Sequence, residues 1–141
     1  MLKNKKVLVV GASGLIGKNL VKNLLDSGSF VIAADLSLNN LNSSLKSVGI
    51  KSDNENCLFR EIDITDKESV KKIFKENDDL TGAVNCSYPR NENYGANFFE
   101  VTPEDFNENI SLNLGSAFLF MQECANYFRT NRNNFSLVNI A

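Results

Sequence analysis

The sequence predicts an α/β protein organised around one doubly wound parallel sheet. Short apolar runs rich in β-branched residues alternate with longer segments of helical periodicity, which is the order expected of βαβ units. A glycine-rich turn follows the first run, and an acidic residue ends the second. Because parallel strands need right-handed crossovers, helices cover both faces of such a sheet. We therefore expect one domain over residues 1–141, with five strands in the order 3-2-1-4-5.

The first two strands and the helices that follow them lie in the first third of the chain. Residues 6–10 form the first strand, and apolar residues at helical spacing over 15–25 predict the first helix. Ser27-Gly28 ends this helix, and residues 30–34 form the second strand. The segment 36–48 predicts a second helix, although its asparagines lower the helix propensity.

The next two strands enclose a shorter helix. Residues 57–62 form the third strand and residues 82–85 the fourth. Between them, Thr65-Asp66-Lys67-Glu68 matches a capping box that begins at Thr65. The helix that it opens faces the sheet with a short apolar side made of Val70, Ile73 and Phe74.

A long helix and a fifth strand complete the predicted sheet. Thr102 before Pro103 starts the helix, with Asp105 in its first turn, and residues 135–140 form the strand. We expect one apolar stripe of the helix to face the sheet: Ile110, Leu114, Ala117, Phe118, Met121, Ala125 and Phe128. A second apolar side lies outside that stripe and suggests a partner: Leu112, Leu119, Phe120 and Tyr127.

The amino-acid composition excludes several classes of function. Fifteen basic and seventeen acidic residues give a net charge of −2, so no positive field favours a nucleic acid or an anionic membrane. The absence of histidine excludes Ser-His and Cys-His catalysis and every metal site that needs a histidine. Cys57, Cys86 and Cys124 form no CxxC pair, so we expect reduced thiols and no metal.

With no signal peptide and no membrane-spanning run, a cytoplasmic protein is expected. Asparagine is unusually frequent but follows no period, which we attribute to composition.

The glycine-rich turn carries the clearest chemical signal. It reads Gly11-Ala12-Ser13-Gly14-Leu15-Ile16-Gly17, a GxxGxxG pattern between the first strand and the first helix. Glycines let the backbone approach a pyrophosphate, whose charge is met by free N–H groups at the helix N-terminus. A tight turn without a ligand would not explain three glycines together with the acid of the next strand. We assign the pyrophosphate contacts to Gly11, Ser13, Gly14, Leu15, Ile16 and Gly17.

Asp35 follows the second strand and is expected to accept hydrogen bonds from an adenosine ribose. A 2′-phosphate at that place would be repelled by roughly 4 kcal/mol at about 4 Å and an effective dielectric of about 20. Neither Leu36 nor Ser37 offers a compensating cation. The sequence therefore favours NAD over NADP. Asp35 is also a plausible cap for the next helix, and the two roles are compatible.

Asp63 and Ile64 end the third strand on the same edge of the sheet. We expect Asp63 to bind the adenine amino group and Ile64 to pack on the adenine ring. The alternative is that Asp63 simply precedes the capping box at Thr65.

These residues resemble the short-chain dehydrogenase/reductase family over the whole chain. The resemblance rests on the three glycines, Asp35, Asp63, Asn85 at the end of the fourth strand, and Asn113 in the long helix. The glycine spacing is similar to that of the extended subfamily of sugar-nucleotide epimerases and dehydratases, whereas the remaining layout resembles the compact reductases. In the family the fourth strand usually ends Asn-Asn-Ala-Gly and contacts the cofactor ribose. This chain departs from that pattern with Asn85-Cys86-Ser87-Tyr88, and we assign the contact to Asn85 and Cys86.

The resemblance implies a catalytic role for Asn113, which matches the asparagine that holds a water in the family's proton relay. The alternative is an ordinary helix asparagine with satisfied hydrogen bonds. In the family, the catalytic serine and a Tyr-x-x-x-Lys pair follow the fifth strand. Tyr88, Tyr94 and Tyr127 are not followed by lysine four positions later. We therefore expect these 141 residues to lack the C-terminal part of the family's fold, to bind cofactor and to be inactive alone.

The segment between the fourth strand and Thr102 is too long for a bare connection and is expected to be functional. We assign substrate contacts to Ser87, Tyr88 and Arg90, since Arg90 can grip a phosphate or carboxylate. The Tyr-Pro-Arg-Asn stretch is similar to bacterial flagellin-modification oxidoreductases. The resemblance also implies a homo-oligomer through the long helix, residues 109–130; the alternative is that later segments cover its second apolar side.

Three functions remain open from the sequence. The first is an NAD-dependent oxidoreductase that moves hydride between nicotinamide and an alcohol or carbonyl, plausibly on a sugar derivative. The second is a non-catalytic module that senses a dinucleotide and binds a partner. The third is an epimerase or dehydratase of the extended subfamily, which would hold NAD through a whole catalytic cycle.

Overall fold

A computed structural model describes residues 1–132 and 134–140; Ala141, the last residue of the predicted domain, lies outside the described residues. Its centre is a five-stranded sheet in the order β3-β2-β1-β4-β5, with every neighbouring pair parallel. This confirms the predicted fold class and strand order. The strands are β1 (Lys6–Val10), β2 (Phe30–Asp35), β3 (Cys57–Glu61), β4 (Gly82–Asn85) and β5 (Ser136–Asn139). The α-helices are α1 (Leu15–Asp26), α2 (Leu38–Lys46), α3 (Lys67–Lys75), α4 (Pro103–Ile110) and α5 (Ser116–Asn131).

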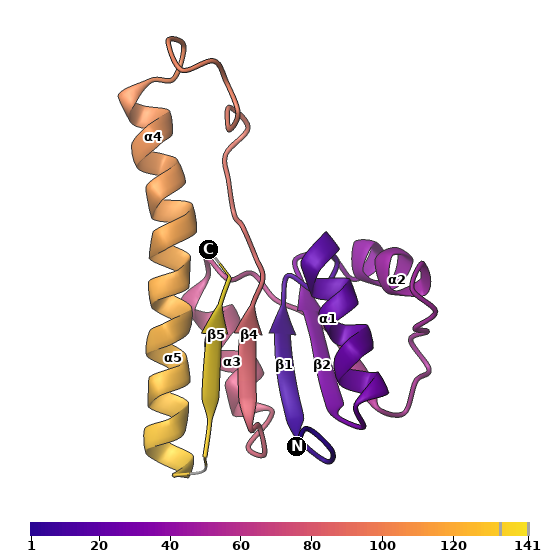
Figure 1. Cartoon of the computed structure of the whole chain (residues 1–141). Helices are drawn as coiled ribbons and strands as arrows, with labels where there is room; N and C mark the ends of the chain where they lie inside the picture. Colours follow the sequence, from indigo (N-terminus) through magenta and orange to yellow (C-terminus); the bar gives the residue numbers. More distant parts are fainter. Residues whose placement is uncertain (133, 141) are drawn as a thin grey trace.

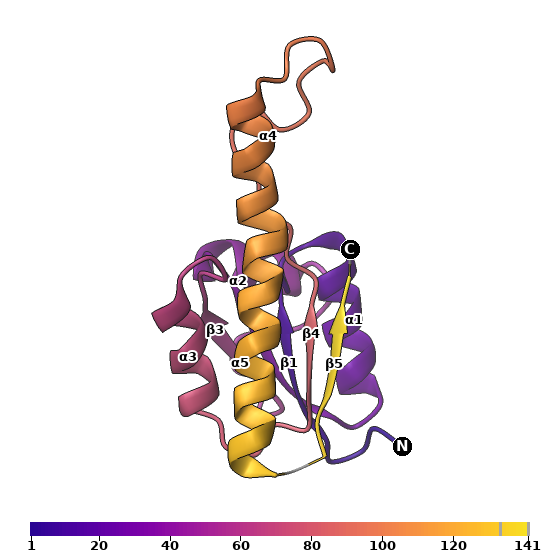
Figure 2. The ribbon, with the colours of Figure 1, turned by 90° about the vertical axis from the view of Figure 1, so that its left-hand side faces the viewer.

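Helices cover both faces of the sheet, as the parallel connections require (Figures 1 and 2). Alternate residues of β1 enter opposite cores, because side chains alternate along a strand. Val9 packs with Val21 and Leu41 from the α1 and α2 side. Leu8 packs with Phe74 and Phe120 from the α3 and α5 side. The paired strands end level, with Val10 opposite both Ala34 and Asn85, so the segments that follow them leave from one edge.

Two helix starts differ from the prediction. Helix α2 begins at Leu38, and its N-cap is Ser37, whose hydroxyl accepts from the Asn40 N–H at 3.3 Å. Asp35 therefore does not cap it. Helix α3 begins at Lys67, and its N-cap is Asp66, whose carboxylate accepts from the N–H groups of Glu68 and Ser69. The predicted capping box from Thr65 is wrong, because the charged Asp66 carboxylate accepts from the free N–H groups, whereas the Thr65 hydroxyl donates to Asp63.

The long helix is continuous from Pro103 and contains one π-helical segment, η1 (Ser111–Gly115), between α4 and α5. Its start is confirmed: Thr102 is the N-cap, accepting from the Asp105 N–H at 3.1 Å, and Pro103 is in the first turn. The lower part lies on the sheet, and α4 projects beyond the edge of the sheet together with the segment that leads to it (Figure 1).

The face of α5 that packs on the sheet is the opposite of the one predicted. Phe120 and Tyr127 are buried, and the Tyr127 hydroxyl accepts from the Leu80 N–H at 2.8 Å. The stripe expected to be buried is instead exposed, most clearly at Leu114 and Phe118. Both sides of the helix are apolar, so periodicity alone does not distinguish them. Ring packing determines which side is buried. The centroid of the Phe74 ring lies 5.7 Å from that of Phe120 and 5.4 Å from that of Tyr127.

Candidate functional site

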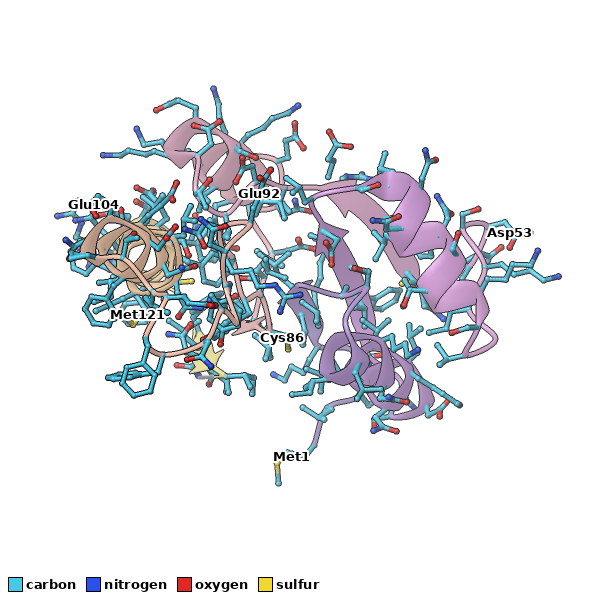
Figure 3. The ribbon with its side chains drawn as sticks, turned by 90° about the horizontal axis from the view of Figure 1, so that it is seen from above. Met1, Asp53, Cys86, Glu92, Glu104 and Met121 are labelled. Atoms are coloured by element: carbon cyan, nitrogen blue, oxygen red, sulfur yellow. The ribbon has the colours of Figure 1, made fainter. Side chains whose placement is uncertain are left out.

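A groove of about 610 Å³ runs along the carboxyl edge of the sheet, which is where open parallel sheets bind ligands. Figure 3 shows Cys86 near the middle of this edge. The groove brings together most residues assigned to cofactor and substrate: Gly11, Ser13, Gly14, Asp35, Asp63, Ile64, Cys86, Ser87, Tyr88 and Arg90. Four residues assigned to the cofactor do not line it: Leu15, Ile16, Gly17 and Asn85. Asn113 does not line it either.

The glycine turn is built around close backbone contacts. Gly11 has φ +75°, and a Cβ there would lie 2.6 Å from the Ser87 N and 2.7 Å from the Cys86 carbonyl carbon. A Cβ on Gly17 would overlap the Gly11 carbonyl. A side chain at Gly11 would therefore push the turn away from the end of β4, and one at Gly17 would push α1 away from the turn.

The N-terminus of helix α1 has no side-chain cap. Its N-cap is Gly14, with no side-chain cap and no acidic residue in the first turn, so the first N–H groups remain available for an anion. The side chains of Leu15 and Ile16 are 76% and 55% exposed. These two side chains point away from the core, so only the backbone N–H groups of Leu15 and Ile16 are available to an anion, and Gly17 allows the helix to pack closely on the turn.

Asp35 is tied to the glycine turn. One carboxylate oxygen accepts from the Ser13 N–H at 2.8 Å and the Ser13 hydroxyl at 2.7 Å, and the other accepts from the Leu36 N–H at 2.8 Å. The second oxygen keeps acceptor capacity for a ligand hydroxyl. Leu36, 65% exposed, lines the groove beside it. Leu36 was not among the predicted site residues, although its position directly after Asp35 places its apolar side chain at the groove.

Asp63 and Ile64 form the far wall of the groove. One Asp63 oxygen accepts from the Thr65 N–H at 2.9 Å and its hydroxyl at 2.6 Å, so Asp63 orders this turn and also faces the groove. Ile64 is largely buried in the core and reaches the groove with one side only. Thr65 also lines the groove and was missed, because the sequence pattern assigned it to a cap.

Asn85 shapes the fourth strand end from within. Its side chain is buried, and its carbonyl oxygen accepts from the Ser87 N–H at 3.0 Å and the Ser87 hydroxyl at 2.5 Å. Asn85 thus positions Ser87, while Cys86 lines the groove. Burial raises the pKa of the Cys86 thiol.

Tyr88 and Arg90 stand at the end of the groove, where the chain leaves the sheet edge. The Tyr88 and Tyr94 hydroxyls are hydrogen bonded at 3.0 Å, and the Arg90 guanidinium lies 5.6 Å from the centre of the Tyr94 ring. The hydrogen bond to Tyr94, and then charge repulsion from it, raise the pKa of Tyr88, and Arg90 opposes this.

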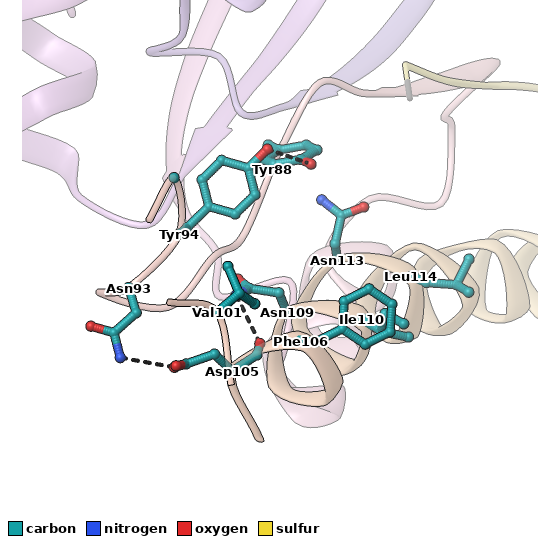
Figure 4. A pocket seen from close by; sticks show the side chains of 11 residues that line it. Tyr88, Asn93, Tyr94, Val101, Asp105, Phe106, Asn109, Ile110, Asn113 and Leu114 are labelled. Atoms are coloured by element: carbon teal, nitrogen blue, oxygen red, sulfur yellow. Dashed lines mark hydrogen bonds between the residues drawn. The ribbon is translucent and has the colours of Figure 1, made fainter. Parts of the chain in front are cut away.

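Asn113 lies in η1, and its backbone carbonyl accepts from the Ser116 hydroxyl at 3.1 Å. Asn113 lines a second cavity together with Tyr88 (Figure 4). Asn113 and the residues assigned to the cofactor therefore line different cavities, and Tyr88 lines both.

The substitution Tyr94→Phe should lower the pKa of Tyr88. It removes both the hydrogen bond and the nearby ionisable hydroxyl that raise this pKa, and it leaves the favourable charge of Arg90. The measurement is a pH titration of the tyrosine Cζ resonances by ¹³C NMR. Tyr127, whose pKa is raised mainly by burial, is the internal control and should not move. An unchanged or higher Tyr88 pKa would show that the two hydroxyls are not bonded in solution.

Two features are absent from the part of the chain that the structure describes. Within 1–132 and 134–140, no three His, Cys, Asp or Glu side chains gather as metal ligands do. In the same part of the chain, no helix has both the length and the apolar character needed to cross a membrane.

Comparison with known proteins agrees with this geometry. Residues 5–141 match the family described as short chain dehydrogenase. One curated relative, the post-translational flagellin modification protein A of Campylobacter coli, is 35% identical over 134 residues, which are 92% of this chain and 52% of the relative. The chain thus spans about half the length of the curated relative that it matches.

Solved structures show the same fold. A short chain dehydrogenase from Bacillus anthracis has a TM-score of 0.83 at 16% identity, covering 99% of this chain and 55% of its own. One from Leptospira borgpetersenii with bound NAD+ has a TM-score of 0.78 at 25% identity, covering 97% and 51%. One from Burkholderia cenocepacia in complex with NADP has a TM-score of 0.73 at 20% identity, covering 99% and 54%.

Proposed function

The chain belongs to the short-chain dehydrogenase family, and from that premise we propose that it binds NAD, in preference to NADP, along the groove at the sheet edge. The observation that carries this is the link between the glycine turn and Asp35: the turn that would hold the pyrophosphate is bonded to the carboxylate that would hold the ribose. The residues present fit such a ligand, because the turn has room only for glycine at Gly11 and Gly17 and the first N–H groups of α1 have no side-chain cap. One structural relative holds NAD+ and another holds NADP, so the preference of this chain is tested with both dinucleotides.

The proposed reaction is oxidation of an alcohol or reduction of a carbonyl, in which the cofactor supplies the hydride chemistry. In this reaction, the glycine turn and Asp35 orient the cofactor, while Tyr88 and Arg90 contact the substrate beyond it. Asn113 holds the position of the family's relay asparagine. These 141 residues contain no Tyr-x-x-x-Lys sequence, so we propose that they supply cofactor binding and substrate positioning. The flagellin modification protein relative supports a sugar derivative as the substrate.

We also propose that two copies associate through the exposed apolar stripe of α5. Phe118, Met121 and Phe128 are 60%, 39% and 51% exposed and lie on one side of the helix. Such a row of large apolar side chains is typical of a surface that is covered in an assembly.

The three cysteines are free thiols, which supports a reducing, cytoplasmic compartment.

Calorimetric titration with NAD and with NADP tests the proposed function. We expect tighter binding of NAD, and we expect NAD to slow alkylation of Cys86 by iodoacetamide, because this thiol lines the groove. Cys57 and Cys124 should not react in the native protein, since burial raises the pKa of each thiol to about 12. Absence of binding by both dinucleotides, or NAD binding that leaves Cys86 fully reactive, would contradict the proposal.

A further inference from the structure

A second cavity, of about 350 Å³, lies between the segment that follows Tyr88 and the start of the long helix (Figure 4). Its size is within the usual range of small-molecule sites, about 300–1,000 Å³. The tyrosine pair and Val101 border it from the segment, and Phe106, Ile110 and Asn113 border it from the helix. None of these apolar side chains belongs to either core of the sheet.

This cavity adjoins the cofactor groove. Tyr88 lines both, and the neighbouring helix residues Leu112 and Asn113 line the groove and the cavity respectively. A molecule whose reacting carbon lay beside Tyr88 in the groove would therefore extend its other end into the cavity.

The walls are held in place before any ligand binds. Asn91 and Asn109 exchange two hydrogen bonds, at 2.9 and 2.8 Å. Asp105 accepts from the side-chain amides of Asn91 and Asn93 at 2.9 and 2.8 Å, and from Thr102 at 2.8 Å. These bonds fasten the projecting segment to α4. Such preorganisation lowers the entropic cost of binding.

The lining selects the chemistry of the occupant. Aromatic and aliphatic side chains present apolar surface, while the paired tyrosine hydroxyls and the Asn113 carboxamide present hydrogen-bonding groups. A purely apolar ligand would cover these polar groups without satisfying them. The one charged side chain in the wall is the Asp105 carboxylate, which disfavours an anion. The fitting ligand is uncharged and has both an apolar face and hydroxyl or amide groups.

We propose that this cavity binds the part of the substrate that does not react, and that this part is an uncharged hydroxylated ring, such as a glycosyl ring. The proposal rests on the proposed function, because the groove must hold the cofactor for the cavity to hold the substrate's far end. It adds Tyr94, Val101, Phe106 and Ile110 to the residues that determine specificity.

The test uses NMR of the ¹⁵N-labelled protein saturated with NAD, titrated with N-acetylglucosamine and, separately, with N-acetylglucosamine 6-phosphate. We expect the neutral sugar to shift the backbone resonances of residues around Tyr94, Val101 and Ile110, and the phosphorylated sugar to bind about tenfold more weakly. No shift with the neutral sugar, shifts confined to other surfaces, or tighter binding of the phosphorylated sugar would overturn the proposal. Binding of NAD without binding of the sugar would overturn only this inference, whereas failure of NAD to bind would contradict the proposed function.

Two variants make the assignment specific. Val101→Trp fills the cavity and should weaken sugar binding by about tenfold or more while leaving NAD affinity unchanged. Leu58→Trp is the matched control, because Leu58 and Val101 are both 41% exposed and Leu58 lies on β3 outside the cavity. Equal sugar affinity in the two variants would place the sugar elsewhere and reject the cavity as its site.

Discussion

Replacing Gly11 with alanine is expected to abolish dinucleotide binding and to lower the free energy of unfolding by about 2–5 kcal/mol. Two effects add. Gly11 has φ +75°, which costs an L-residue about 1–2 kcal/mol. The new Cβ would also lie 2.6–2.8 Å from backbone atoms of Cys86 and Ser87, and relieving such overpacking costs about 1–3 kcal/mol. The backbone must move apart at the point where the pyrophosphate is expected.

The chain offers a control that separates the two effects. Gly49 has φ +84°, and a Cβ there would meet nothing within 4 Å. Gly49→Ala should therefore show only the backbone strain, about 1–2 kcal/mol, and should bind NAD as the parent does. Urea unfolding of both variants, with equal denaturant slopes, gives the comparison. Equal losses of stability would mean that the close contact between Gly11 and the β4 end does not exist in solution.

The fold was predictable because its signals are local and repeated. Buried parallel strands read as short apolar runs, and all five appear where the sequence places them, β1 and β4 without any change of bounds. The orientation of α5 was not predictable in this way. Apolar residues occupy both of its sides, and the choice between Phe118 and Phe120 depends on the Phe74 ring of α3, which is distant in sequence.

The candidate site also has one part that local sequence signals predict and one part that they do not. The glycine turn and Asp35 were predictable, because each lies directly after a strand whose end the sheet brings to one edge. The second cavity was not, because it depends on hydrogen bonds between Asn91 and Asn109, which are 18 residues apart. The frequent asparagines follow no period in the sequence, yet Asn91, Asn93 and Asn109 hold the projecting segment in place.

Replacing Asp35 with alanine should weaken NAD binding by roughly 10- to 100-fold, since a hydrogen bond to a charged group contributes about 1.5–3 kcal/mol. The same substitution should weaken NADP less, or strengthen it, because the repulsion of a 2′-phosphate disappears with the carboxylate. We therefore expect the ratio of NAD to NADP affinity to fall by at least about tenfold, measured by calorimetry with each dinucleotide.

The ratio is the informative quantity, because Asp35 has a second role in the free protein. Its carboxylate accepts from the Ser13 N–H and hydroxyl, so its removal also loosens the glycine turn and weakens both dinucleotides alike. Ser13→Ala is the matched control: it removes one of these bonds and keeps the charge. We expect it to lower both affinities by a similar factor and to leave the ratio unchanged. If Asp35→Ala also leaves the ratio unchanged, the carboxylate only fastens the turn, and the discrimination between NAD and NADP must come from residues outside this contact.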